Sequence, residues 1–210
     1  MKKHRKFRSV VQKEEKKSNL SLYWSIFISV IMVGAVGGII LSNPNTESSY
    51  VYGKYSFSTK DNLWVTKISG KETSFYFLPD QVSYVNISSQ AITAVKDRTS
   101  LVVLFNPDLN DSLKLQAIDL FRFELVETLT KTYPQKQLGF AVTKNSTQYP
   151  YQIISCANAS FYTPILFVDY GNETSVEYSN NCIKVSALDE RSVLIVLDDL
   201  RYHIYGVFDD

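Results

Sequence analysis

The chain has 210 residues, of which 45% are hydrophobic and 20% charged, a composition typical of a folded protein that excludes a disordered or low-complexity chain. This length accommodates one domain of ordinary size with appendages. The net charge of +1 conceals an asymmetry, because residues 1–22 carry eight basic and two acidic side chains, whereas residues 23–210 carry fourteen basic and nineteen acidic ones. We therefore expect the two parts of the chain to lie in different environments.

A basic tail, residues 1–19, precedes an uncharged segment, residues 20–41. These 22 residues would form a helix about 33 Å long at 1.5 Å per residue, and a bilayer core needs about 20 such residues. Tyr23 and Trp24 suit an interfacial aromatic belt. Because basic residues favour the inner side of a membrane, the sequence predicts a single-pass protein of the cell membrane. A signal anchor holds it in the lipid, the tail is cytoplasmic, and the C-terminal domain lies outside.

Residues 20–41 have two other interpretations. A buried core helix would need a larger polar face than the serine stripe of this segment. A cleaved signal peptide would have a shorter apolar region. The tail motif KKHRKFR could also bind nucleic acid. Next to a span, however, its charge suits membrane orientation and anionic lipid, so we expect no nucleic-acid partner. Gly34 and Gly38 are spaced as in GxxxG helix dimers and allow a homodimer through the span.

After the span, residues 42–52 are expected to form a polar stem and residues 53–210 an extracytoplasmic domain. Alternating patterns and turn residues predict its elements. The order is strands at 55–58, 63–68 and 73–78, a helix at 88–97, a strand at 101–105, a helix at 111–132, a strand at 138–143, a hairpin of 164–170 and 174–179 around Gly171-Asn172, a strand at 182–187 and a helix at 189–205. This order predicts the α/β (α+β) class, with one mixed sheet and packed helices.

The two cysteines, Cys156 and Cys182, enclose the second predicted hairpin. An oxidising exterior favours a disulfide, which would stabilise a loop of this size by about 3.5 kcal/mol in the chain-entropy model. Free or redox-active thiols remain the alternative, although the Cys-x-x-Cys spacing of a redox pair is absent. A zinc site needs three or four ligands, and the only histidines are His4 and His203, so we expect no metal.

Five N-x-S/T sequons follow the span, where chance predicts roughly two. Their asparagines are Asn86, Asn110, Asn145, Asn158 and Asn172. Most lie at predicted turns, where a glycan is tolerated, so we expect glycosylation of these residues. An unmodified surface rich in Asn and Ser is the alternative.

No catalytic motif is evident in the sequence. Glycines after the span are isolated, so no phosphate-binding loop is predicted, and no G-x-S-x-G turn indicates a nucleophile. Asp198 and Asp199 could form a carboxylate pair, but a solvated face of the last helix explains them too. We therefore expect no catalytic residue and no cofactor. Thirteen of the fourteen tyrosines follow the span, and tyrosine suits interfaces.

The stretch TPILFVDYGNETSVEYS, followed by a short strand and an amphipathic helix, resembles the second half of a thioredoxin-type fold. In that family a pair such as Thr163-Pro164 begins a strand that leads into a hairpin and a closing helix. This chain lacks the family's Cys-x-x-Cys motif and carries Cys182 on an additional strand. The basic tail, the span, the LWVTKISGK hairpin and the C-terminal LDDLRYHIYGV together resemble archaeal single-span membrane proteins, a resemblance that implies no activity.

These observations predict a membrane-anchored domain that binds or assembles at the cell surface with a protein or cell-envelope partner. A thioredoxin-like redox or other enzyme-accessory domain is the alternative, and a third hypothesis is a subunit of a larger membrane complex.

Overall fold

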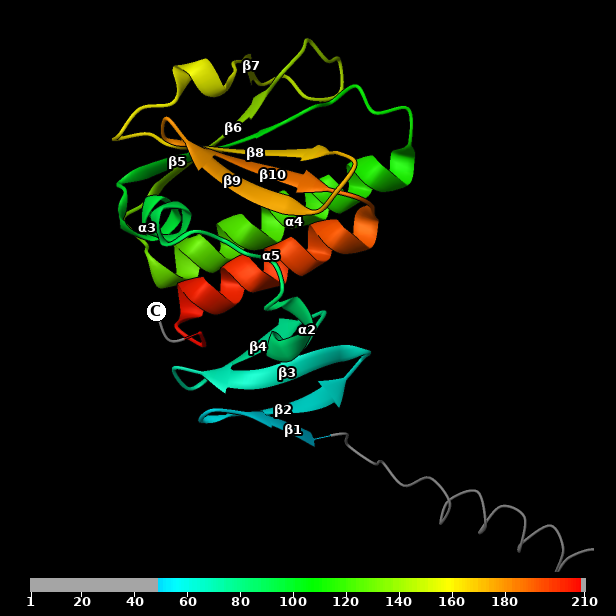
Figure 1. The fold of residues 1–210 in the computed structure, drawn as a ribbon, viewed down its shortest axis with the longest axis vertical. Helices are drawn as coiled ribbons and strands as arrows, with labels where there is room; N and C mark the ends of the chain where they lie inside the picture. The colour runs from blue at the N-terminus through cyan, green and yellow to red at the C-terminus, as the bar shows by residue number, and fades with distance from the viewer. Residues whose placement is uncertain (1–48, 209–210) are drawn as a thin grey trace, which may run out of the picture. The chain divides into compact units, whose positions relative to one another are not determined.

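The computed structural model describes residues 49–208, which form two β-sheets and four α-helices (Figure 1). The helices are α2 (Pro79–Val82), α3 (Ser89–Asp97), α4 (Ser112–Thr132) and α5 (Glu190–Tyr205), with a 3₁₀ turn η1 (Cys156–Asn158). The predicted tail, span and Gly34–Gly38 contact lie outside the described residues. Within residues 49–208, no helix combines the length and the apolar character that a membrane crossing requires.

The first sheet is an antiparallel meander with strand order β1-β2-β3-β4. Its strands are β1 (Ser49–Tyr52), β2 (Tyr55–Lys60), β3 (Leu63–Ile68) and β4 (Lys71–Phe75). The predicted hairpin of the last two strands is confirmed, and its turn residues Ser69 and Gly70 both have positive φ, 51° and 79°, as a two-residue hairpin turn requires. Residues 49–52, expected as part of a polar stem, instead pair with β2.

The second sheet has six strands in the order β7-β6-β5-β8-β10-β9. Its strands are β5 (Ser100–Phe105), β6 (Gln137–Val142), β7 (Gln152–Ile153), β8 (Ile165–Tyr170), β9 (Ser175–Ser179) and β10 (Cys182–Ala187). Every neighbouring pair is parallel except β9 with β10. The mixed α/β class is therefore confirmed, but the expectation of one sheet is wrong, because the N-terminal strands form a sheet of their own.

The predicted hairpin of β8 and β9 is also wrong, because β10 lies between these two strands. β9 pairs instead with β10 through a turn at Asn180 and Asn181, whose φ angles are 50° and 63°. Asparagine tolerates this left-handed conformation, so the Asn-Asn pair closes the tight turn. Residues 171–174 then form a loop that crosses the end of β10 from β8 to β9.

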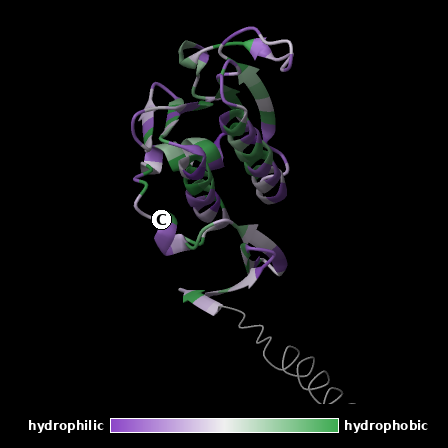
Figure 2. Cartoon of the chain, turned by 90° about the vertical axis from the view of Figure 1, so that its right-hand side faces the viewer, coloured by the Kyte–Doolittle hydropathy of each residue, from purple (hydrophilic) through white to green (hydrophobic). Residues whose placement is uncertain are grey.

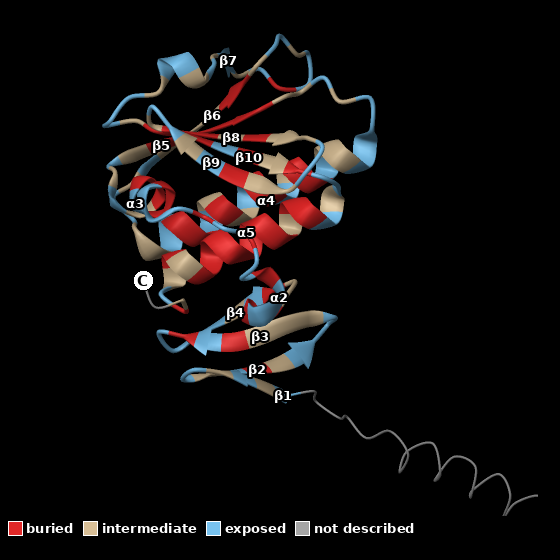
Figure 3. Ribbon diagram, in the orientation of Figure 1, coloured by how far each residue is buried: buried red, intermediate tan, exposed pale blue. Residues whose placement is uncertain are grey.

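The elements lie in layers (Figure 1). Helices α4 and α5 cover one face of the six-stranded sheet, and the meander lies on the far side of these helices. Residues 154–163, which include η1, lie over the opposite face of the sheet. Hydrophobic positions alternate with hydrophilic ones along both long helices (Figure 2), and α5 is buried along most of its length (Figure 3).

The ends of the long helices follow from local signals in the sequence. The Asp111 side chain accepts hydrogen bonds from the N–H groups of Leu113 and Lys114, and Asp189 accepts one from the N–H of Ser192. Both aspartates are therefore N-caps. Gly206 ends α5 with φ 67°, a conformation that a glycine adopts without steric cost.

A buried arginine fastens the segment after β6 to α4. The side chain of Arg122 is 1% exposed, and its guanidinium carbon lies 4.2 Å from the ring centroid of Phe105 and 5.3 Å from that of Tyr149. Asp119 accepts hydrogen bonds from Arg122 and, at 2.7 Å, from the Tyr149 hydroxyl. Burial, and to a smaller extent the hydrogen bond to Asp119, raises the pKa of Tyr149 to about 12. Cation–π contacts thus replace part of the hydration that the buried cation loses.

Candidate functional site

The acidic pair of the last helix is buried, which corrects the prediction of a solvated face. Asp198 is 0% exposed and Asp199 is 1% exposed. The prediction failed because the apolar stripe of α5 covers only the six-stranded sheet, and the remaining faces of α5 are covered by α4, by α3 and by the meander with α2. Carboxyl groups with perturbed pKa are the usual starting point in a search for an active site.

An ionic cluster surrounds Arg201, whose side chain is 7% exposed. Its Nη1 donates to Asp198 Oδ1 at 3.0 Å and to Glu124 Oε2 at 2.9 Å. Its Nε donates to Thr128 Oγ1 at 3.2 Å, and its Nη2 donates to the Ser74 carbonyl at 2.8 Å. One guanidinium group therefore joins α5, α4 and the last strand of the meander.

Asp198 also connects α5 to the chain after β4. Its Oδ2 accepts hydrogen bonds from the backbone N–H groups of Tyr76 at 2.6 Å and Phe77 at 2.9 Å. The Tyr202 hydroxyl donates to the Phe77 carbonyl at 2.6 Å. The chain that leaves β4 is thus held to α5 by three hydrogen bonds, two of which end on a carboxylate.

The two aspartates titrate in different surroundings. Burial raises the pKa of Asp198 to about 7, while Arg201 and the two N–H groups oppose this shift. Burial alone raises the pKa of Asp199 to about 8. Its Oδ2 has no hydrogen-bond partner among the described residues, and its Oδ1 lies 4.0 Å from His203 Nε2. A carboxyl in this position is neutral over much of the pH range in which an exposed aspartate is ionised.

Neither aspartate can reach a substrate, because both side chains are covered by packed elements. The cluster is therefore structural. Within residues 49–208, no group of three or more His, Cys, Asp or Glu side chains is arranged to hold a metal ion.

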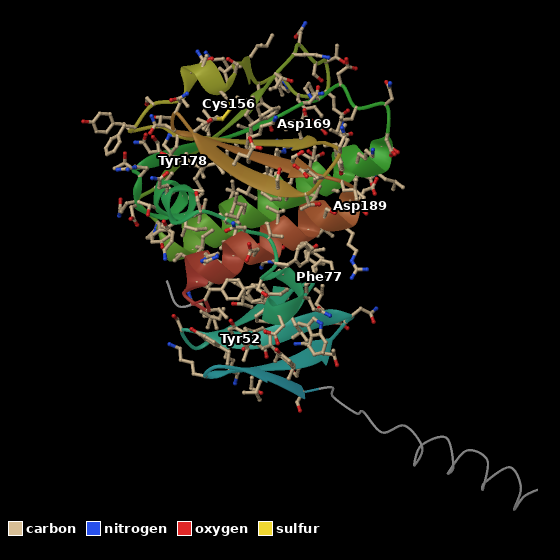
Figure 4. All side chains as sticks on the ribbon, viewed as in Figure 1. Tyr52, Phe77, Cys156, Asp169, Tyr178 and Asp189 are labelled. Atoms are coloured by element: carbon tan, nitrogen blue, oxygen red, sulfur yellow. A yellow bond between two sulfur atoms is a disulfide. The ribbon has the colours of Figure 1, made fainter. Side chains whose placement is uncertain are left out.

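The predicted Cys156–Cys182 disulfide is formed, with the two Cα atoms 5.5 Å apart. Cys182 begins β10, and Cys156 lies in η1 on the sheet face opposite the long helices (Figure 4). On that face the cysteines pack with Leu104, Ala141 and Ile165 in a small apolar cluster. The bridge therefore pins residues 154–163, here called the stapled segment, against the outer face of the sheet.

The stapled segment exposes two neighbouring aromatic side chains. Phe161 is 52% exposed and Tyr162 is 75% exposed. The guanidinium of Arg98 lies 3.6 Å from the ring centroid of Phe161, and Ser100 Oγ donates to the Tyr162 carbonyl at 2.7 Å. Phe161, Tyr162 and Arg98 form what we call the aromatic tip, and aromatic residues with arginine dominate the binding energy of many interfaces.

All five sequon asparagines are exposed, as glycosylation requires. Asn110, Asn145 and Asn172 lie in the loops after the carboxyl ends of β5, β6 and β8. Asn158 has a structural role of its own, because its Oδ1 accepts a hydrogen bond from the Ser155 N–H at 2.9 Å. Glycosylation itself stays a prediction.

No protein-family model, no curated protein sequence and no solved structure matches this chain. The candidate site therefore comes from geometry alone. The sequence located the disulfide but not the aromatic tip, although the adjacent Phe161 and Tyr162 within the disulfide loop were a signal that could have indicated it.

Substitution of Arg201 by alanine should cost about 3–5 kcal/mol of unfolding free energy, because it leaves the Asp198 carboxylate buried without its cation. Equilibrium urea unfolding of the full chain in mild detergent measures this loss. Lys131→Ala is the matched control: it removes an ion pair with Glu127 in which both side chains are more than half exposed, so the loss should stay below about 0.5 kcal/mol. Equal losses in the two variants would contradict the structural role of Arg201.

Substitution of Asp199 by asparagine should change the pH dependence of stability. The pKa of Asp199 is about 8 in the folded protein, against an ordinary 3.8. Between pH 4 and pH 8 the folded wild type therefore keeps a proton that the unfolded chain has released. Wild-type stability falls as the pH rises through this range. The variant lacks this fall, so its melting temperature should equal that of the wild type near pH 4 and exceed it at pH 8. Asp97→Asn, at an exposed position, is the control; parallel curves for wild type and Asp199→Asn would refute the assignment.

Proposed function

We propose that this protein is a membrane-anchored domain outside the cell that binds a protein or cell-envelope partner through its aromatic tip. Residues 20–41 hold it in the membrane lipid, with the tail in the cytoplasm. The observation that carries the binding role is the exposure of Phe161 and Tyr162 on a segment joined to the sheet by a disulfide. A surface that is ordered before binding loses less conformational entropy on association.

Two features of the described residues support the external location. Both cysteines are joined in a disulfide, a bond that persists in oxidising compartments. The five sequon asparagines are all accessible. The proposed span explains how residues 49–208 would reach such a compartment, and Gly34 with Gly38 offers a contact to a second copy within the membrane.

The binding role rests on the chemistry of the aromatic tip. Phe161 and Tyr162 contribute large apolar area with few rotatable bonds, and the Tyr162 hydroxyl can hydrogen-bond at the rim of a contact. Arg98 stacks on Phe161, so a partner that covers the ring also meets a positive charge. This combination suits a partner surface with a shallow apolar depression and acidic groups beside it.

The location is tested by cysteine accessibility in intact cells. A membrane-impermeant maleimide should label Gln135→Cys, in the exposed turn before β6, and should leave Ser9→Cys, in the basic tail, unlabelled until the cells are permeabilised. The reverse pattern would place the domain in the cytoplasm and remove the proposal.

The binding role is tested by a photo-crosslinking amino acid at Tyr162, with Tyr84 as the matched control because it is an exposed tyrosine at 65%. We expect one discrete adduct from position 162 and none from position 84, and Phe161→Ser should reduce the adduct at least tenfold. Equal adducts at both positions would contradict the proposal. An absence of adducts combined with a disulfide that mild reductant opens would favour the redox-domain alternative.

A further inference from the structure

A hollow of about 400 Å³ lies on the outer face of β8, β10 and β9, away from the stapled segment. Strand register places two rows of side chains across its floor. One row is Phe167, Lys184 and Glu177, and the other is Asp169, Ser186 and Ser175. The outer face of the sheet is thus apolar under the stapled segment and largely polar at this end.

The loop of residues 171–174 closes one side of the hollow because it crosses the end of β10. Gly171 lies so close to the strand that a Cβ atom there would be 2.0 Å from Ser186 Oγ. Its N–H donates to the Ala187 carbonyl at 2.9 Å. The loop is therefore pressed onto β10, and the next residue, Asn172, is exposed and lines the hollow.

The floor of the hollow suits a sugar. Asp169 and Glu177 can accept hydrogen bonds from hydroxyl groups, and bonds to a charged acceptor are the stronger kind. Lys184 can donate to ring or hydroxyl oxygens, and the ring of Phe167 offers a flat apolar surface to the C–H face of a pyranose. Small-molecule sites usually combine an apolar surface with a few polar groups around it.

We propose that this hollow holds the first sugar residues of an N-linked glycan attached to Asn172. Asn172 is the one sequon asparagine among the lining residues of the hollow. A covalent attachment at the rim gives the sugar a high effective concentration over the floor, so weak contacts suffice to hold it. The inference depends on the proposed function, because attachment requires the domain to lie outside the cytoplasm.

The attachment reaction needs one co-reactant, an oligosaccharide joined to a lipid through a phosphate. The Asn172 amide nitrogen forms a bond to the anomeric carbon, the bond from that carbon to the lipid phosphate breaks, and the lipid phosphate leaves with the proton that the amide loses. The Thr174 hydroxyl supplies the third position of the sequon and accepts a hydrogen bond from the Leu188 N–H at 3.4 Å.

The test compares two sequons on the full chain, purified in detergent from its own cells. Glycopeptide mass spectrometry measures occupancy at each site. Asn172→Gln should lower the melting temperature by about 2–4 °C, the range expected for a modest loss in a protein of this size, and Asn145→Gln, whose asparagine does not line the hollow, should leave it unchanged within about 1 °C. Under native conditions, an endoglycosidase should release the Asn172 glycan more slowly than the Asn145 glycan.

A second pair of variants separates contact with the sugar from a simple effect on folding. Glu177→Ala removes an acceptor from the floor and should lower the melting temperature of the glycosylated protein, but not in the Asn172→Gln background. Glu127→Ala, at an exposed position on α4, should have the same small effect in both backgrounds. Equal effects of Glu177→Ala in both backgrounds, or equal release of the two glycans, would overturn the inference.

The outcomes also separate this inference from the proposed location. If none of the five sequons carries a glycan, the inference fails, and the maleimide labelling at residues 9 and 135 then shows whether the external location fails with it. If other sequons are occupied while Asn172 is empty, the location survives and only the assignment of the hollow is wrong.

Discussion

The buried pairing of Arg201 with Asp198 and Glu124 is the interaction on which the arrangement of layers depends. Helix α5 lies between the six-stranded sheet and the meander, and its residues Asp198, Asp199 and Arg201 are buried there. A charge in that position is tolerated only when it is paired and hydrogen-bonded. Arg201 and Asp198 meet this condition by binding the backbone of β4 at Ser74 and the backbone just after it at Tyr76 and Phe77, which fixes the meander on the helices.

This arrangement gives the two faces of the six-stranded sheet different coverings. Among the described residues, the helices and the meander occupy one face of the six-stranded sheet, and the opposite face carries the stapled segment and the polar hollow. On the outer face a disulfide holds a short segment, rather than a helix, against the sheet. Both surfaces that we assign to function lie on this outer face.

Local signals in the sequence were sufficient for most elements, whereas long-range contacts were not. The caps Asp111 and Gly206 and the alternation along β2 to β4 determine structure within a few residues, so they could be predicted. The separation of two sheets and the insertion of β10 beside β8 depend on contacts between distant residues. The burial of Asp198 could not be foreseen for the same reason: its partners, Tyr76 and Phe77, lie more than 120 positions away. The disulfide could be predicted from the expected oxidising compartment together with the absence of a Cys-x-x-Cys motif, but the exposure of Phe161 and Tyr162 depends on how the bridge orients the segment.

Native-state hydrogen exchange on the full chain tests the central claim most directly, because it measures the opening free energy of each amide. If the ionic cluster unites the layers, the amides of β2, β3 and β4 exchange with the same free energy as those of α5 in the wild type. In Arg201→Ala the amides of the meander then open first. Independent opening of the meander in the wild type, at a free energy well below that of α5, would contradict the account.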